Sequence, residues 1–185
     1  MTAPLIKLLT AIILPTAVFF IGGYLMLNLT GRDAFPQTSA PESVPLHFRM
    51  GSYNVEQVQA YWNWLGPEGR GAELRFLHAD LVFPVMYGGA ILVALLIVSN
   101  ELGRPLKPQW LVLPVGITVA ADWGENLLHW QQLSRFLKDE PVQAAWLQLS
   151  SLATTTKTIF FALSVLLLLV MATWRISQFF RRQGF

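Results

Sequence analysis

The chain has 185 residues, of which 54% are apolar, 12% are aromatic and only 13% carry a charge. This composition is too apolar and too poor in charge for an ordinary soluble domain, and it indicates an integral membrane protein. The net charge of +2 is too small to indicate nucleic-acid binding, and the absence of cysteine excludes disulfides, thiol nucleophiles and Cys-ligated metal. We predict no cofactor and no nucleic-acid partner.

A helix needs about 20 apolar residues to cross a bilayer. Four stretches come close to this length, and they predict an all-α, polytopic membrane protein in which residues 1–185 form a single four-helix transmembrane domain. The predicted spans are 6–28, 77–99, 110–130 and 152–174, with an external loop over 29–76. The first span exceeds the ~7–15 apolar residues of a secretory signal, so we expect it to be retained. Its Gly22 and Gly23 predict close approach of a neighbouring helix.

The long loop changes character along its length. Residues 30–45, TGRDAFPQTSAPESVP, are rich in turn-forming residues and predict an extended segment without a fold of its own. Further on, Asn54 can cap an amphipathic helix that ends near Gly66 and Pro67. Its apolar stripe comprises Val55, Val58, Tyr61, Trp62 and Leu65. Two interpretations stay open for this external helix: an anchor in the membrane interface or a lid over the bundle.

The second span carries a carboxylate near its beginning. Asp80 is expected about one turn inside the membrane, and Tyr87 follows seven residues later on the same helical face. Pro84 stands between them and removes a backbone donor, so we expect it to loosen the helix around Asp80. The short connection after this span predicts that the second and third spans are antiparallel neighbours.

The third span contains the densest polar pattern, AADWGENLLHW at 120–130. Four polar residues recur there at i, i+3, i+4 and i+7, which places them on one helical face: Asp122, Glu125, Asn126 and His129. In the fourth span, Lys157 lies on a polar stripe that is expected to face the bundle rather than lipid, together with Ser150, Thr154 and Ser164.

The topology predicts that ionisable residues from three helices converge at similar depth in the outer half of the bundle: Asp80, Asp122, Glu125, His129 and Lys157. Each ionisable group in a bilayer costs at least ~2.5–3.5 kcal/mol, so these groups are expected to meet each other rather than lipid. With His129 neutral, three carboxylates face one ammonium group. Such an imbalance requires protons, a cation or water to compensate it.

Positive residues indicate the orientation, because short cytoplasmic flanks retain Lys and Arg. One side of the predicted topology carries Lys7, Arg104, Lys107, Arg175, Arg181 and Arg182. On the other side, basic residues are diluted over long loops and offset by acidic ones. The sequence therefore predicts a multi-pass protein of the cell inner membrane with both termini in the cytoplasm.

Two resemblances rest on the quoted residues. The order Asp80, Phe83-Pro84 and Tyr87-Gly88, followed by Asp122-x-x-Glu125-Asn126, resembles a group of uncharacterised bacterial four-helix integral membrane proteins. This resemblance implies a four-span layout and no assigned activity. More remotely, the architecture is similar to that of the EXPERA superfamily of sterol isomerases and sterol-binding proteins, which implies a hydrophobic ligand.

Four interpretations of the polar face stay open: a buried network that only fixes helix packing, a site for a lipid-like molecule, a metal site, or proton or ion transport. A single His beside Lys157 disfavours the metal, so no metal ligand is assigned, and four helices offer little room for alternating access. The leading hypothesis is a carboxylate-rich pocket that binds a lipid or hydrophobic small molecule. In this hypothesis Asp80, Asp122 and Glu125 are the functional carboxylates.

The other candidate residues support the carboxylates in that hypothesis. Lys157 balances their charge, His129 relays protons, and Tyr87 and Asn126 orient the ligand or its partners. The contrasting hypothesis is a non-enzymatic membrane scaffold or accessory subunit. A second copy of the chain or another membrane protein would then be the partner, and the sequence does not determine which.

Overall fold

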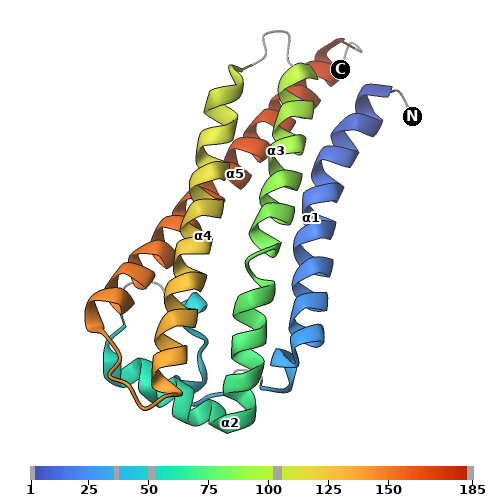
Figure 1. Ribbon diagram of the computed structural model, residues 1–185. Helices are drawn as coiled ribbons and strands as arrows, with labels where there is room; N and C mark the ends of the chain where they lie inside the picture. The colour runs from blue at the N-terminus through green and yellow to red at the C-terminus, as the bar shows by residue number, and fades with distance from the viewer. Residues whose placement is uncertain (1–2, 36–37, 50–52, 102–105, 183–185) are drawn as a thin grey trace.

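The computed structural model describes residues 3–35, 38–49, 53–101 and 106–182, and in these residues it contains helices and no strand. Four long helices lie side by side in Figure 1: α1 (Ala3–Thr30), α3 (Phe83–Glu101), α4 (Pro108–Phe136) and α5 (Ala144–Arg182). The fifth helix, α2 (Val55–Ala79), lies across the end of the bundle opposite the start of α1. Three short 3-10 turns lead from α1 to it: Arg32–Ala34, Pro41–Ser43 and Leu46–Phe48. The predicted all-α class is confirmed.

Three stretches contain a helix long and apolar enough to cross a membrane: Ile6–Thr30, Val55–Glu101 and Ala144–Gln178. The first and third lie in α1 and α5, and the second covers α2 and α3. Although α4 is 29 residues long, it does not reach the same apolar character, because its inner face carries Asp122, Glu125, Asn126 and His129. Length and composition thus support three of the four predicted spans directly.

One predicted span is interrupted, and the others lie within longer helices. The stretch 77–99 is not one helix, because α2 continues to Ala79, residues 80–82 form a turn, and α3 begins at Phe83. The spans 110–130 and 152–174 lie inside α4 and α5, since α4 continues to Phe136 and α5 begins at Ala144. Apolar runs mark only the part of a helix suited to lipid, and the polar turns beyond it stay helical here.

An apolar core joins the four long helices in the half of the bundle nearer the termini. It is built from α1, α3, α4 and α5, by Leu8, Ala11, Tyr87, Ile91, Ala94, Leu95, Val98, Leu111, Val115, Leu168, Met171 and Ala172. The close approach predicted at Gly22 is confirmed, because a Cβ atom there would lie 2.7 Å from Cε2 of Phe83. Similarly, a Cβ atom on Gly88 would lie 2.6 Å from Cγ2 of Val119, so α3 and α4 also pack closely.

At the end where the chain begins, an ion-paired group connects three helices. Glu101 on α3 accepts from Lys7 on α1 at 2.7 Å and lies 3.7 Å from a guanidinium nitrogen of Arg175 on α5. Arg104, one of the basic residues that predicted the orientation, lies outside the described residues. These contacts hold the same ends of α1, α3 and α5 together.

The amphipathic helix predicted in the loop is confirmed as the first part of α2. Asn54 caps it, with a reciprocal bond between Asn54 and Gln57. Gly66 adopts the left-handed region (φ 64°) and kinks the helix, which then resumes at Pro67 and continues to Ala79 instead of ending. The buried part of its apolar stripe packs against Leu133 of α4 and Leu147 of α5, with Val58, Tyr61, Trp62 and Leu65 inside. The first part of α2 therefore packs on the ends of α4 and α5.

A buried ion pair, missed in the sequence, fixes the segment after α1. Arg32 donates to Glu73 of α2 at 2.6 Å and to the hydroxyl of Tyr61 at 2.7 Å, and it also donates to the Phe35 carbonyl. Both charged side chains are 4% exposed. The segment 30–45, predicted as an extended loop, is thus attached to α2 by an ion pair in which Arg32 neutralises the buried Glu73.

Candidate functional site

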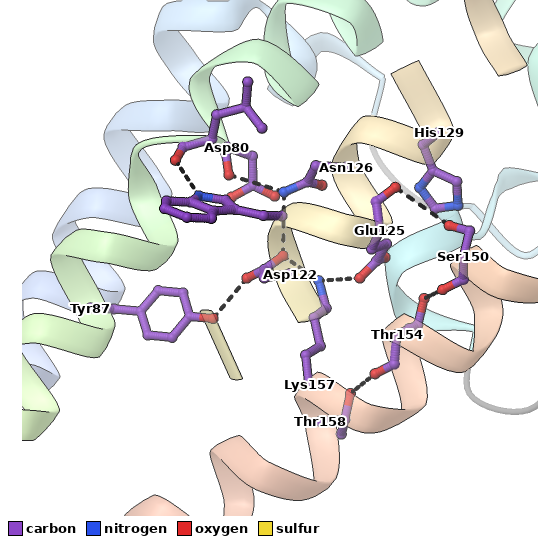
Figure 2. A network of polar contacts seen from close by, with 12 residues as sticks. Asp80, Tyr87, Asp122, Glu125, Asn126, His129, Ser150, Thr154, Lys157 and Thr158 are labelled. Atoms are coloured by element: carbon purple, nitrogen blue, oxygen red, sulfur yellow. Dashed lines mark hydrogen bonds and ion pairs between the residues drawn. The ribbon is translucent and has the colours of Figure 1, made fainter. Parts of the chain in front are cut away.

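The site begins at the break between α2 and α3. A helix donates the N–H of residue i+4 to the carbonyl of residue i, so Asp80 would need a donor at position 84, and Pro84 has none. The side-chain amide of Asn126 on α4 supplies it, donating to the Asp80 carbonyl at 3.0 Å. The indole N–H of Trp123, one turn earlier, donates to the Leu81 carbonyl at 2.7 Å. Two α4 side chains thus complete the hydrogen bonding of the broken helix, and Figure 2 shows the contact between Asn126 and Asp80.

Asp122 lies at the centre of the polar cluster and receives donors from three directions. Its Oδ2 atom accepts from the Tyr87 hydroxyl of α3 at 2.7 Å. Its Oδ1 atom accepts from Nζ of Lys157 on α5 at 2.9 Å and from the Asn126 amide at 3.3 Å. The predicted face of α4 is therefore turned inward, with one residue from each neighbouring helix paired to the same carboxylate (Figure 2).

Glu125 is less completely paired. The side chain is 0% exposed, and its Oε2 atom lies 2.6 Å from Nζ of Lys157. Its Oε1 atom is buried without a hydrogen-bond partner among the described residues. A buried carboxylate oxygen without a donor costs free energy, so this oxygen is a place where a proton, water or a ligand group would be stabilised.

His129 contacts a residue that the sequence analysis did not identify. Its Nε2 atom lies 2.5 Å from the hydroxyl of Tyr53, which directly precedes the cap of α2, and both side chains are buried. Burial raises the pKa of Tyr53 to about 12, against the opposing effect of the Ser150 and Thr154 hydroxyls. Tyr53 therefore keeps its proton at neutral pH, and its hydroxyl donates to Nε2 of His129 or accepts from it according to which ring nitrogen of the imidazole carries the hydrogen.

The polar stripe predicted on α5 faces the bundle, as expected. Ser150, Thr154 and Ser164 are all buried, and Lys157 is half-buried between Asp122 and Glu125. The Ser150 hydroxyl donates to the Glu125 backbone carbonyl at 3.4 Å, and the Thr154 hydroxyl donates to the Ser150 carbonyl at 3.1 Å. Much of the hydrogen-bonding capacity of this stripe is thus used within α5 and towards α4.

The structure brings all seven predicted site residues to one region, with two adjustments. Asp80 lies in the turn between α2 and α3 rather than inside a span, and Asn126 contacts its backbone carbonyl. His129 pairs with Tyr53 rather than with the carboxylates. Sequence reasoning missed Tyr53 and Trp123, because Tyr53 lies in a loop and Trp is common at membrane interfaces without any role in a site. The only signal for Trp123 was its position next to Asp122 in the sequence, on a helix predicted to neighbour the span that contains Pro84.

Two surface pockets lie on the α2 side of the molecule. One has a volume of about 440 Å³ and is lined by Tyr53, Asn54, Val55, Glu56, Gln57, Ala144 and Gln148. The other, of about 390 Å³, is lined by Pro41, Glu42, Val44, Arg49, Gln57 and Ala60. Among these lining residues, Tyr53 also contacts His129.

The chemistry of the cluster follows from its charges. Three carboxylates, Asp80, Asp122 and Glu125, are accompanied by one ammonium group, Lys157. Among the described residues, no three His, Cys, Asp or Glu side chains are grouped so that they could hold a metal ion. The cluster is suited to hydrogen bonding, to accepting a proton and to binding a positively polarised group.

Comparisons of the chain with protein-family models, curated proteins and solved structures found no match.

Proposed function

We propose that this protein is a multi-pass membrane protein whose carboxylate-rich cluster binds a lipid-like or other hydrophobic small molecule. The observation that carries the proposal is Glu125, which is fully buried and holds one carboxylate oxygen without a partner among the described residues. Lys157 is already shared between Asp122 and Glu125, so it does not neutralise the cluster alone. A ligand with a hydrogen-bond donor would satisfy the free oxygen and reduce the cost of the buried charge.

An aromatic group beside the cluster supports an amphipathic ligand. The hydroxyl of Tyr87 donates to Asp122, while its ring lies 5.6 Å from Phe161 and 5.3 Å from Phe83. Phe19 stacks on Phe161 with 5.3 Å between ring centroids. Polar and aromatic surfaces therefore meet at one residue, as is typical of sites for molecules with a polar group and an apolar body. If the ligand is a substrate, the carboxylates and His129 are the groups available for general acid and base chemistry.

The proposed location is the cell inner membrane, with the termini in the cytoplasm and the cluster in the outer half. Three apolar helices support membrane insertion, and α4 would be the fourth span with its polar face inward. α1 begins and α5 ends at the same end of the bundle, which an even number of spans requires (Figure 1). The basic residues Lys7, Lys107, Arg175 and Arg181 lie towards this end.

The proposal is tested by measuring which lipid or small molecule co-purifies with the protein. We would purify wild type and Glu125→Gln in mild detergent and compare the bound molecules by native mass spectrometry. The control is Glu68→Gln, the same chemical change at an exposed position of α2. We expect Glu125→Gln to keep the thermal stability of the wild type and to retain at least about tenfold less of the bound molecule. This is the effect of losing one charge-assisted hydrogen bond. Equal retention in folded wild type and Glu125→Gln would refute the proposal.

The second candidate is a scaffold or accessory subunit in which the cluster only holds the helices together. The observation that favours it is the pair of donors from Asn126 and Trp123, which bond the backbone carbonyls of the broken helix and so connect it to α4. The same experiment separates the two candidates. Loss of folded protein on Glu125→Gln, without any molecule bound to the wild type, would favour the scaffold.

A further inference from the structure

The position of Tyr53 connects the outside of the protein with the buried cluster. Tyr53 is one of the residues that line the 440 Å³ pocket between the beginnings of α2 and α5. Its hydroxyl lies 2.5 Å from Nε2 of His129, and the two rings lie 5.8 Å apart at a tilt of 41°. The pocket and the buried imidazole are thus separated by one side chain that can donate and accept a proton.

His129 and Glu125 continue this connection towards the cluster. They lie four residues apart on α4, so they are neighbours on the same helical face, and both are buried. Glu125 has a free lone-pair position at Oε1, whereas its Oε2 atom is occupied by Lys157. Figure 2 shows His129 and Glu125 on the side of α4 that faces Ser150 and Thr154. The free oxygen is therefore the acceptor at the inner end of the path.

We propose that Tyr53 and His129 form a proton path between the external pocket and Glu125. Tyr53 donates its hydroxyl proton to Nε2 of His129 and takes one from water in the pocket. The imidazolium formed then releases the proton on its other ring nitrogen to Oε1 of Glu125. One proton moves from the pocket to the carboxylate, and no oxidant, reductant or further reactant is needed. The inference goes beyond ligand binding, because it holds whether or not the cluster contains a hydrophobic molecule.

The groups around the path decide where the proton stays. Lys157 on α5 and the imidazole of His47 face His129, and the Lys157 charge disfavours a lasting imidazolium, so the proton passes on from His129. Glu125 on α4 and Lys157 also face Tyr53, and the hydroxyls of Ser150 and Thr154 lie beside the Tyr53 hydroxyl. Three carboxylates against one ammonium group favour uptake of a proton by the cluster over its release. Because burial raises the pKa of Tyr53 to about 12, its hydroxyl is protonated at neutral pH and gives up its proton only as it takes another from water.

Hydrogen–deuterium exchange of the buried carboxylic acid tests the path. The protein is reconstituted into phosphatidylcholine nanodiscs without added ligand, and the infrared carbonyl band of protonated carboxyl groups is followed as the buffer is acidified. The band that disappears in Glu125→Gln belongs to Glu125. Its shift after rapid transfer to D₂O then reports how fast protons reach that residue.

We expect Tyr53→Phe to slow this exchange by about a hundredfold, the usual effect of removing a positioned proton donor. This variant keeps the ring against His129, and equal melting temperatures of variant and wild type verify the fold. His129→Leu should slow exchange to a similar extent. Tyr24→Phe removes the same atom from an exposed position on α1 and should leave the rate unchanged.

Three results would overturn the inference. Wild type and Tyr53→Phe could exchange at the same rate, Tyr24→Phe could slow exchange as much as Tyr53→Phe, or the wild type could show no band that depends on Glu125. Each of these outcomes is independent of co-purified ligand, so failure of the path and failure of the proposed ligand binding are distinguishable.

Discussion

Replacing Asn126 with Leu tests whether α4 repairs the break that Pro84 makes. The substitution removes the donor to the Asp80 carbonyl, a 3.0 Å bond between residues that are at most 5% exposed. Water cannot easily replace such a donor, so the free energy of unfolding should fall by about 1–3 kcal/mol. Part of this loss belongs to the weaker 3.3 Å bond from Asn126 to Asp122.

The decisive measurement is a double-mutant cycle with Pro84→Ala. This substitution restores a backbone N–H at the position from which a continuous helix would donate to Asp80. Asn126→Leu should therefore cost about 1 kcal/mol less in the Pro84→Ala background than in the wild type. Trp123→Phe, which removes only the donor to the Leu81 carbonyl, is a companion variant without an effect on the carboxylates.

Reversible unfolding in mixed micelles of dodecyl maltoside and SDS, followed by far-ultraviolet circular dichroism, gives the four free energies of the cycle. A cost of Asn126→Leu that is the same in both backgrounds, within about 0.5 kcal/mol, would refute the reasoning. It would mean that Asn126 acts through Asp122 rather than through the carbonyl that Pro84 leaves without a donor.

Three other features of the structure lead to further predictions. Lys157→Met removes the ammonium group that lies 2.9 Å from Asp122 and 2.6 Å from Glu125, and it should destabilise the protein by about 3–5 kcal/mol in the same micelle assay. Adding Glu125→Gln should restore part of this stability. The absence of any restoration would contradict the ion-pair account. Gly22→Ala places a Cβ atom 2.7 Å from the Phe83 ring and should cost about 1–3 kcal/mol, which Phe83→Leu should relieve; an unrelieved cost would place the clash elsewhere. Burial holds the pKa of His47 well below its usual 6.5, so the unfolded chain gains a proton below pH 6.5 while the folded chain does not. Limited proteolysis of the segment before α2 should therefore accelerate as the pH falls through 6.5 in wild type but not in His47→Gln. Equal acceleration in both proteins would contradict the role of His47.

The long apolar helices and the inward face of α4 could be predicted from the sequence because both depend on local sequence pattern. Apolar runs located α1, α3 and α5, and the spacing of Asp122, Glu125, Asn126 and His129 determined that they share one side of a helix. The cap at Asn54 was equally local, since a side chain that bonds a backbone group three residues away needs no tertiary structure. The roles proposed for these residues remain predictions.

Contacts between distant segments could not be read in the same way. Tyr53 and His129 are 76 residues apart, and Arg32 and Glu73 are 41 apart, so their pairing depends on how α2 folds back over the bundle. The sequence shows Arg32 and Glu73 only as charges in a long loop. Packing of the apolar face of α2 on α4 and α5 brings them together and takes them out of water.

The break at Asp80 combines both kinds of information. The sequence by itself determined that Pro84 removes a donor, because proline has no backbone N–H. Only the tertiary structure decided where the helix stops and which groups replace the missing bond, since Asn126 and Trp123 reach the free carbonyls from a different helix. The same holds for the site. The sequence determined that carboxylates in an apolar chain need partners. The packing of α3, α4 and α5 decided that Asp122 has three donors, whereas one oxygen of Glu125 has none among the described residues.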